Sequence, residues 1–79
     1  MKFNVEYTDT FGGEANYCWV RRESIELPEG VSQSHIMRQA KRAVGINGLR
    51  GKTFAYGGNE AFEFRPHRVA TVMFVTAEY

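Results

Sequence analysis

Hydrophobic and polar residues alternate at the start of the chain, where Phe3, Val5 and Tyr7 are separated by polar side chains. A period of two is typical of a β-strand with one buried face. Residues 8–13 then form a turn-rich segment that ends in a Gly-Gly pair. The pattern therefore predicts a first strand that leads into a hairpin turn.

A second alternating segment covers about residues 15–27. Its large apolar residues share one parity: Tyr17, Trp19, Ile25 and Leu27. Arg21 and Glu23 fall on the same parity and interrupt that face. We expect either a bulge that shifts the register there or a strand that leaves the core and returns. Pro28-Glu29-Gly30 ends the segment.

A helical period follows, with apolar and polar residues on opposite arcs. The apolar arc contains Ile36, Met37, Ala40, Ala43 and Val44, and the polar arc contains Ser34, His35, Arg38, Gln39, Lys41 and Arg42. Ser32 or Ser34 can cap the start of this helix, and Gly45 or Gly48 can end it. We expect the apolar arc to be buried against a sheet.

Three further strands are predicted, over about residues 52–56, 61–65 and 69–77. Gly57-Gly58-Asn59 separates the first two and repeats the Gly-Gly turn found near the start. Glycine adopts the positive φ that tight hairpin turns require, so we expect positive φ in both pairs. The last segment is the most apolar, which favours a strand in the middle of the sheet with Val72 and Phe74 mainly inside.

Together these elements predict one α+β domain over residues 1–79, with the order β-β-α-β-β-β. The simplest arrangement is a four- to five-stranded antiparallel sheet with one amphipathic helix packed on one face. Eleven of the 79 residues are aromatic, and we expect most of these to cover the helix-facing side of the sheet. The two Gly-Gly turns are best explained by shared hairpin chemistry rather than by an internal repeat.

Candidate catalytic and metal-binding residues are few. Cys18 is the single cysteine, so one chain can form neither a disulfide nor a cysteine-based zinc site, and in a strand it is best interpreted as a small hydrophobic residue. His35 and His67 lie in no recognisable motif. The glycines of segment 45–51 follow a helix and lack the Lys-Ser/Thr ending of a phosphate-binding loop. We therefore expect no enzyme activity, no metal and no cofactor.

The distribution of charge is more informative than its sum. The chain has 10 basic and 9 acidic residues, and this balance alone implies no polyanionic partner. Between Gly30 and Asn59, however, there is no Asp or Glu. The cationic residues of this stretch form the predicted partner-binding surface: Arg38, Lys41, Arg42, Arg50 and Lys52. A solvated helix face, a nucleic-acid site and a site for an acidic or RNA-containing complex all remain open.

The segment Tyr7-Thr8-Asp9-Thr10-Phe11-Gly12-Gly13-Glu14-Ala15-Asn16-Tyr17-Cys18-Trp19-Val20-Arg21-Arg22 resembles the opening of small uncharacterised proteins of tailed phages and prophages. It covers about a fifth of the chain. The resemblance implies a small protein of the host bacterial cytoplasm and assigns no functional residue. The first residues also lack the apolar run of a signal peptide, and no stretch approaches a membrane span.

Many phage proteins of this kind block a host machine. We therefore expect a non-enzymatic interaction protein that binds and inhibits a host protein or ribonucleoprotein defence complex, as anti-CRISPR proteins do, with no membrane partner. The alternative is a small nucleic-acid-binding module that uses the basic helix face.

Overall fold

The computed structural model describes residues 1–58 and 60–78 and contains one helix and five strands, in the predicted order. The elements are β1 (Lys2–Phe11), β2 (Glu14–Glu26), α1 (Gln33–Ala43), β3 (Gly51–Tyr56), β4 (Ala61–Pro66) and β5 (Thr71–Glu78). The predicted α+β class, with one helix on an antiparallel sheet, is confirmed.

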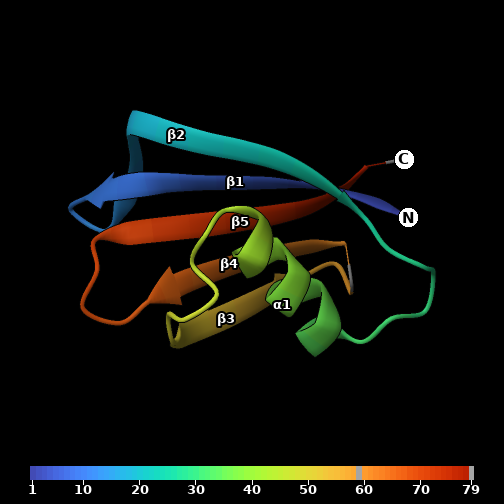
Figure 1. Ribbon diagram of the computed structural model, residues 1–79. Helices are drawn as coiled ribbons and strands as arrows, with labels where there is room; N and C mark the ends of the chain where they lie inside the picture. Colours follow the sequence, from blue (N-terminus) through green and yellow to red (C-terminus); the bar gives the residue numbers. More distant parts are fainter. Residues whose placement is uncertain (59, 79) are drawn as a thin grey trace.

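The five strands form a single antiparallel sheet in the order β2-β1-β5-β4-β3. The apolar β5 lies in the middle, as its composition predicted. β2 and β3 are the two edges, so the segment that contains α1 carries the chain from one edge of the sheet to the other (Figure 1). This crossover places α1 over one face of the sheet.

The core lies between α1 and the inner strands. The helix contributes Ile36, Met37, Ala40 and Val44, and the loop after it contributes Ile46. The sheet contributes Phe3, Val5 and Tyr7 from β1, Phe62 and Phe64 from β4, and Met73 and Val75 from β5. The predicted apolar arc of the helix and the alternation of the first strand are both confirmed.

The ends of α1 are set by local chemistry. The Ser32 hydroxyl accepts a hydrogen bond from the His35 backbone N–H at 3.2 Å, so Ser32 rather than Ser34 is the N-cap. Gly45, with a φ of +78°, follows the C-terminal cap Val44. Within the described residues, no helix has the length and apolarity needed to cross a membrane.

Both Gly-Gly turns have the predicted backbone. Gly12 and Gly13 have φ values of +62° and +85°, and Gly57 and Gly58 have values of +61° and +70°. Asn59, which was assigned to the second turn, lies outside the described residues. The prediction of positive φ in each pair is confirmed.

The irregularity of β2 differs from both alternatives that the sequence left open. β2 pairs with β1 without a break from Glu26 to Val20. The register then shifts, because Val20 pairs with Thr8 and the next pair is Ala15 with Thr10. Residues 16–19 of β2 therefore stand against the single residue Asp9 of β1. The bulge lies before Arg21 and Glu23 and not at them. Arg21 and Glu23 keep the parity of the helix-facing side because the strand there is regular.

Hydrogen bonds to β1 hold this bulge. The Asp9 carboxylate accepts from the Asn16 side chain and from the Cys18 backbone N–H, each at 2.9 Å. The pKa of Asp9 is lowered, chiefly by the bond from Asn16. The Thr8 hydroxyl donates to the Trp19 carbonyl at 2.7 Å. Cys18 is consequently exposed, so its interpretation as a packed small hydrophobic residue is wrong.

The prediction that Val72 lies inside is confirmed, whereas Phe74 is only half-buried. Tyr7 pairs with Met73, so Met73 and Val75 face the helix. Val72 is fully buried but belongs to the opposite face, and Phe74 on that face is only half-buried. A continuous apolar run cannot reveal which of its two parities faces a helix, because both are hydrophobic.

Most aromatic residues do not cover the helix-facing side, contrary to the expectation. Among the described residues, the buried aromatics are Phe3, Tyr7, Phe62 and Phe64, whereas Phe11, Tyr17, Trp19, Phe54 and Tyr56 are exposed. The physical reason is strand parity. Thr53 pairs with the core residue Phe64 on the helix side, so Phe54 and Tyr56 lie on the opposite face of the sheet.

Replacement of Gly51 by alanine should destabilise the fold strongly. A Cβ atom at this position would lie 2.1 Å from the Arg65 carbonyl oxygen and 2.6 Å from Pro66 Cα, so the backbone of β4 would have to move. We expect a loss of about 1–3 kcal/mol in the free energy of unfolding, measured by urea titration. Gly48→Ala is the matched control, because its Cβ meets nothing within 4 Å and its φ is not positive. Equal stability of the two variants would contradict the tight β3–β4 approach.

Truncation of Ile36 should also destabilise the fold, for a different reason. Its side chain is 2% exposed and packs between α1 and the sheet, so Ile36→Ala leaves a cavity. The expected cost is about 2–5 kcal/mol. Arg38→Ala, on the exposed side of the same helix, should leave thermal melting nearly unchanged. An unchanged melting temperature for Ile36→Ala would show that the helix is not docked as described.

Candidate partner-binding groove

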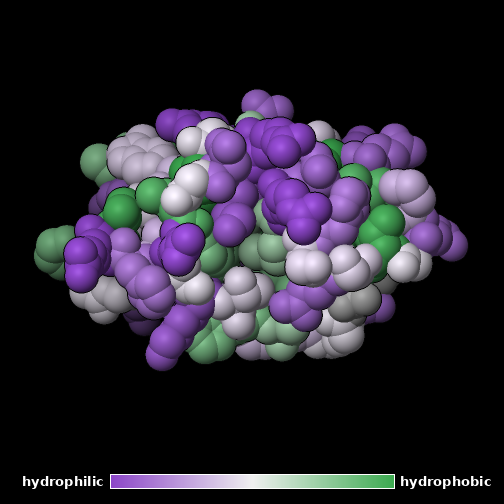
Figure 2. All heavy atoms as spheres, turned by 60° about the horizontal axis from the view of Figure 1, so that its bottom comes forward, coloured by the Kyte–Doolittle hydropathy of each residue, from purple (hydrophilic) through white to green (hydrophobic). Residues whose placement is uncertain are grey.

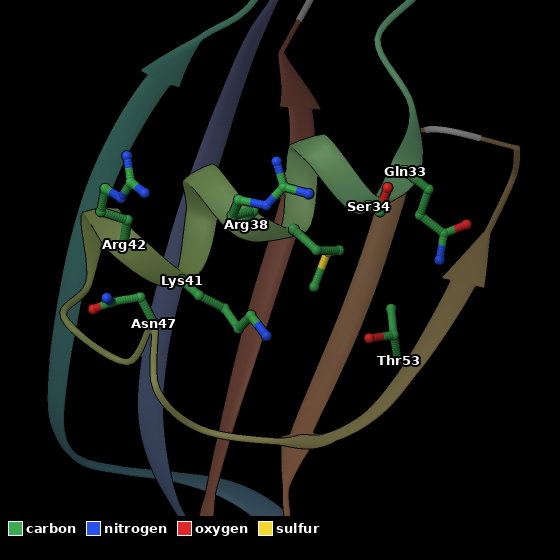
Figure 3. Close-up of a pocket in the computed structure, with 8 residues that line it drawn as sticks. Gln33, Ser34, Arg38, Lys41, Arg42, Asn47 and Thr53 are labelled. Carbon is green, nitrogen blue, oxygen red and sulfur yellow. The ribbon is translucent and has the colours of Figure 1, made fainter.

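An open groove runs between α1 and the edge strand β3. It forms because the helix packs on β1, β5 and β4 and leaves β3 uncovered. Its volume is about 740 Å³, and its lining residues are Gln33, Ser34, Met37, Arg38, Lys41, Arg42, Asn47 and Thr53 (Figure 3). Most of these belong to α1, whereas Thr53 stands across the groove on β3.

Three of the five predicted binding residues line this groove: Arg38, Lys41 and Arg42. They meet there because positions three and four apart lie on one side of a helix. Figure 3 shows Lys41 reaching from α1 toward the strands, while Arg38 and Arg42 extend over the outer surface of the helix. Arg38 and Arg42 are exposed, as expected.

Lys41 differs from its two neighbours, because it does not simply point to solvent as its helical position suggested. Its ammonium nitrogen lies 4.7 Å from the centre of the Phe64 ring and donates a hydrogen bond to the Leu49 carbonyl at 3.4 Å. The residue is half-buried. Lys41 therefore contributes charge to the groove and also ties α1 to β4 and to the loop before β3.

The charge of the groove is not balanced locally. Its lining contains no Asp or Glu among the residues that the structure describes. The ion pairs among the described residues all lie outside the groove: Lys2–Glu78, Arg22–Glu6 and Arg65–Glu63. Figure 2, which turns the lower side of Figure 1 toward the viewer, shows strongly hydrophilic side chains gathered beside paler and hydrophobic areas. The groove is therefore a cationic surface, since Arg38, Lys41 and Arg42 line it.

Arg50 and Lys52 do not line the groove. Thr53 pairs with the core residue Phe64 and so faces the helix side, which places the neighbouring Lys52 on the opposite face of the sheet. Arg50 is exposed in the loop before β3, where its carbonyl accepts a hydrogen bond from the His67 N–H at 2.8 Å. The five residues that the sequence grouped by proximity are thus divided between separate surfaces.

The sequence also left out several groove residues. Gln33 and Asn47 supply amide groups, the buried core residue Met37 borders the groove, and Thr53 forms the far wall. Helical spacing places Gln33 one turn before Met37, so this pair could have been found from the sequence. Nothing local links Thr53 to α1, because their proximity depends on the register of β3 against β4.

The opposite face of the sheet has a different character. Glu6 accepts a hydrogen bond from the Tyr17 hydroxyl at 2.7 Å and pairs with Arg22 at 2.9 Å. The pKa of Tyr17 is raised, first by its hydrogen bond to Glu6. Arg65 pairs with Glu63 at 2.5 Å. On this face Glu6 and Arg22, and Glu63 and Arg65, neutralise each other, whereas no carboxylate within residues 1–58 and 60–78 pairs with the groove cations.

Within the part of the chain that the structure describes, no cluster of three or more His, Cys, Asp or Glu could hold a metal ion. The comparisons with known proteins add no further constraint. No family model matches the chain, and no curated protein or solved structure shows significant similarity to it. The resemblance of residues 7–22 to phage proteins stays a prediction, and function has to be argued from the groove.

Reversing the charge of Lys41 should cost more stability than reversing that of Arg38. Lys41→Glu removes the contact with Phe64 and the bond to the Leu49 carbonyl, and it places a carboxylate over the ring. We expect a loss of about 1 kcal/mol. Arg38→Glu is the matched control on the exposed side and should stay within about 0.5 kcal/mol of the parent. Urea titration of both variants measures the difference, and equal stabilities would show that Lys41 is only a solvated charge.

Proposed function

We propose that this chain is a non-catalytic interaction protein that binds an acidic surface of a host protein or ribonucleoprotein complex through the α1 groove, and that binding inhibits the complex. The observation that carries the proposal is the set of three cations in one open groove without a lining carboxylate. A partner that brings carboxylates to this groove would meet uncompensated positive charge, which favours association and orients the partner.

The composition of the groove also suits a protein partner. Arginine is enriched at protein interfaces, and the groove presents two exposed arginines. Arg38 and Arg42 offer planar guanidinium groups that can bind carboxylates through two parallel hydrogen bonds.

The finer proposal is that the partner is a bacterial defence complex, so that the chain acts as an anti-CRISPR-like inhibitor in the host cytoplasm. Its support is the resemblance of residues 7–22 to small phage proteins. The groove adds a requirement, because the surface that it contacts on such a complex has to be acidic.

A nucleic-acid-binding module is the second candidate. The same three cations could contact phosphates, and the Gln33 and Asn47 amides beside them could donate further hydrogen bonds. The two candidates differ in their response to salt. Phosphate contacts on duplex DNA weaken with a log–log slope of about −0.9 for each phosphate neutralised, whereas an interface anchored by packed side chains responds less.

The double variant Arg38→Glu/Arg42→Glu should keep the fold and lose the partner. Both side chains are exposed, so circular dichroism and melting should stay close to those of the parent. Partner binding should fall about tenfold or more, because the reversed charges would repel an acidic surface. Affinity capture from bacterial lysate, with and without nuclease, identifies the partner, and a binding titration with the purified partner measures the loss.

Arg50→Glu/Arg68→Glu is the matched control for that experiment. It changes the net charge by the same amount at two exposed loop positions outside the groove. We expect this control to retain binding. Equal loss in both double variants would show that overall charge rather than the groove drives association. Capture that disappears on nuclease treatment, with a steep salt dependence, would favour the nucleic-acid candidate.

A further inference from the structure

β3 is an edge strand with a free side. It is the last strand in the sheet order, and residues 52–56 are all exposed. It contains no proline, and its pairing with β4 runs from Gly51 to Tyr56 without a bulge. Lys52 is its one charged residue. These features matter because proline, bulges and charges are the usual means by which proteins prevent edge strands from pairing with another chain.

The other edge of the sheet is protected in this way. β2 carries the bulge at residues 16–19 and a run of charged residues at positions 21–23. Both features oppose the addition of a further strand. The contrast leaves β3 as the edge that is able to accept one.

The direction of the free backbone groups on β3 follows from its pairing. Gly51 pairs with Pro66, which has no N–H to donate. Next to this pair, the His67 N–H donates to the Arg50 carbonyl at 2.8 Å. The pair Gly51–Pro66 is therefore not directly hydrogen-bonded, and the pattern alternates along the strand. Phe54 consequently directs its N–H and C=O toward β4, whereas Thr53 and Ala55 direct theirs outward.

We propose that β3 pairs with β3 of a second copy of this chain, antiparallel and about a two-fold axis centred on Phe54. In this register Thr53 faces the second copy's Ala55, and the outward groups of both residues form direct hydrogen bonds on each side of the axis. The paired edges join two five-stranded sheets into one ten-stranded sheet.

The side chains of β3 are complementary to themselves in this register. Lys52, Phe54 and Tyr56 lie on one face of the strand, because alternate residues share a face. Antiparallel pairing about Phe54 sets Lys52 opposite the second copy's Tyr56, where the ammonium group can contact the aromatic ring. Phe54 lies opposite its own counterpart, and such aromatic cross-strand pairs stabilise sheets. The lysines of the two copies are kept apart, so like charges do not meet.

The symmetry has a consequence for the groove. A two-fold axis through an antiparallel strand pair is perpendicular to the sheet, so both copies of α1 lie on the same side. Thr53 lines the groove and also lies at the new seam, so the two cationic grooves flank that seam. The role of this doubled surface in partner binding rests on the proposed function, whereas the pairing of the strands does not.

The first test is the mass of the protein in solution, measured by light scattering and sedimentation over a range of concentrations. We expect a species of twice the 9.0 kDa chain mass that dissociates on dilution. Thr53→Pro should give the single-chain mass, because it removes an outward N–H while the bonds from β3 to β4 remain. Thr53→Val keeps the N–H and should remain dimeric. A parent protein that stays at the single-chain mass at every concentration would overturn the proposal, as would a dimeric Thr53→Pro.

The second test addresses the register and uses no proline variant, so it does not depend on the folding of Thr53→Pro. In a Cys18→Ser background, Phe54→Cys places two thiols opposite each other at the axis, within the Cα separation that a disulfide allows. Mild oxidation should yield a covalent dimer. Lys52→Cys is the control and should not cross-link, because its counterpart lies roughly 13 Å away along the strand. Cross-linking of the control but not of Phe54→Cys would overturn the register.

Strand pairing and the proposed function can fail separately. A single-chain Thr53→Pro that still captures the partner would support strand pairing and show that one groove is sufficient for binding. Dimerisation that survives in Arg38→Glu/Arg42→Glu while the partner is lost would support both proposals. Capture of a foreign peptide on β3 in place of a second copy would overturn the proposed occupant.

Discussion

The burial of one sheet face beneath α1 is the interaction on which the rest of the structure depends. The helix supplies Ile36, Met37, Ala40 and Val44, and the inner strands supply the side chains that meet them. In a chain of 79 residues this is the only large apolar contact in the described part, and small domains bury too little surface to tolerate its loss. The cap at Ser32 and the turn at Gly45 fix where the helix begins and ends against this face.

The same contact creates both surfaces that are available for binding. A helix of 11 residues is too narrow to cover five strands. It contacts β2 at one edge of the sheet and leaves β3 open at the other. On the β3 side, the uncovered space is the groove in which Arg38, Lys41 and Arg42 gather. The free edge of β3 has the same origin. The cationic groove and the strand edge are thus consequences of one packing arrangement.

On the β2 side, polar and aromatic contacts join the strand to β1 and to the end of α1. Arg21 lies over the Tyr7 ring at 5.8 Å from its centre and donates to the Val44 carbonyl at the end of α1. A cation at the C-terminus of a helix interacts favourably with the helix dipole. Trp19 packs beside Tyr7 with the ring centres 5.3 Å apart. An arginine that interrupts an apolar pattern is therefore accommodated without an unpaired buried charge.

The sequence alone determined the type and order of the elements, because these depend on local periodicity and turn chemistry, and it left the number of strands at four or five. The helix arc, the alternation of β1 and the Gly-Gly turns were all predicted correctly from spacing. It also located the cationic stretch that contains Arg38, Lys41 and Arg42. Only the tertiary structure decided which side chains of β5 face the helix and where the β2 bulge lies. It also placed Thr53, and not Lys52, in the lining of the groove. The physical reason is that these features depend on register between strands distant in the chain, and a shift of one residue moves every side chain to the other face.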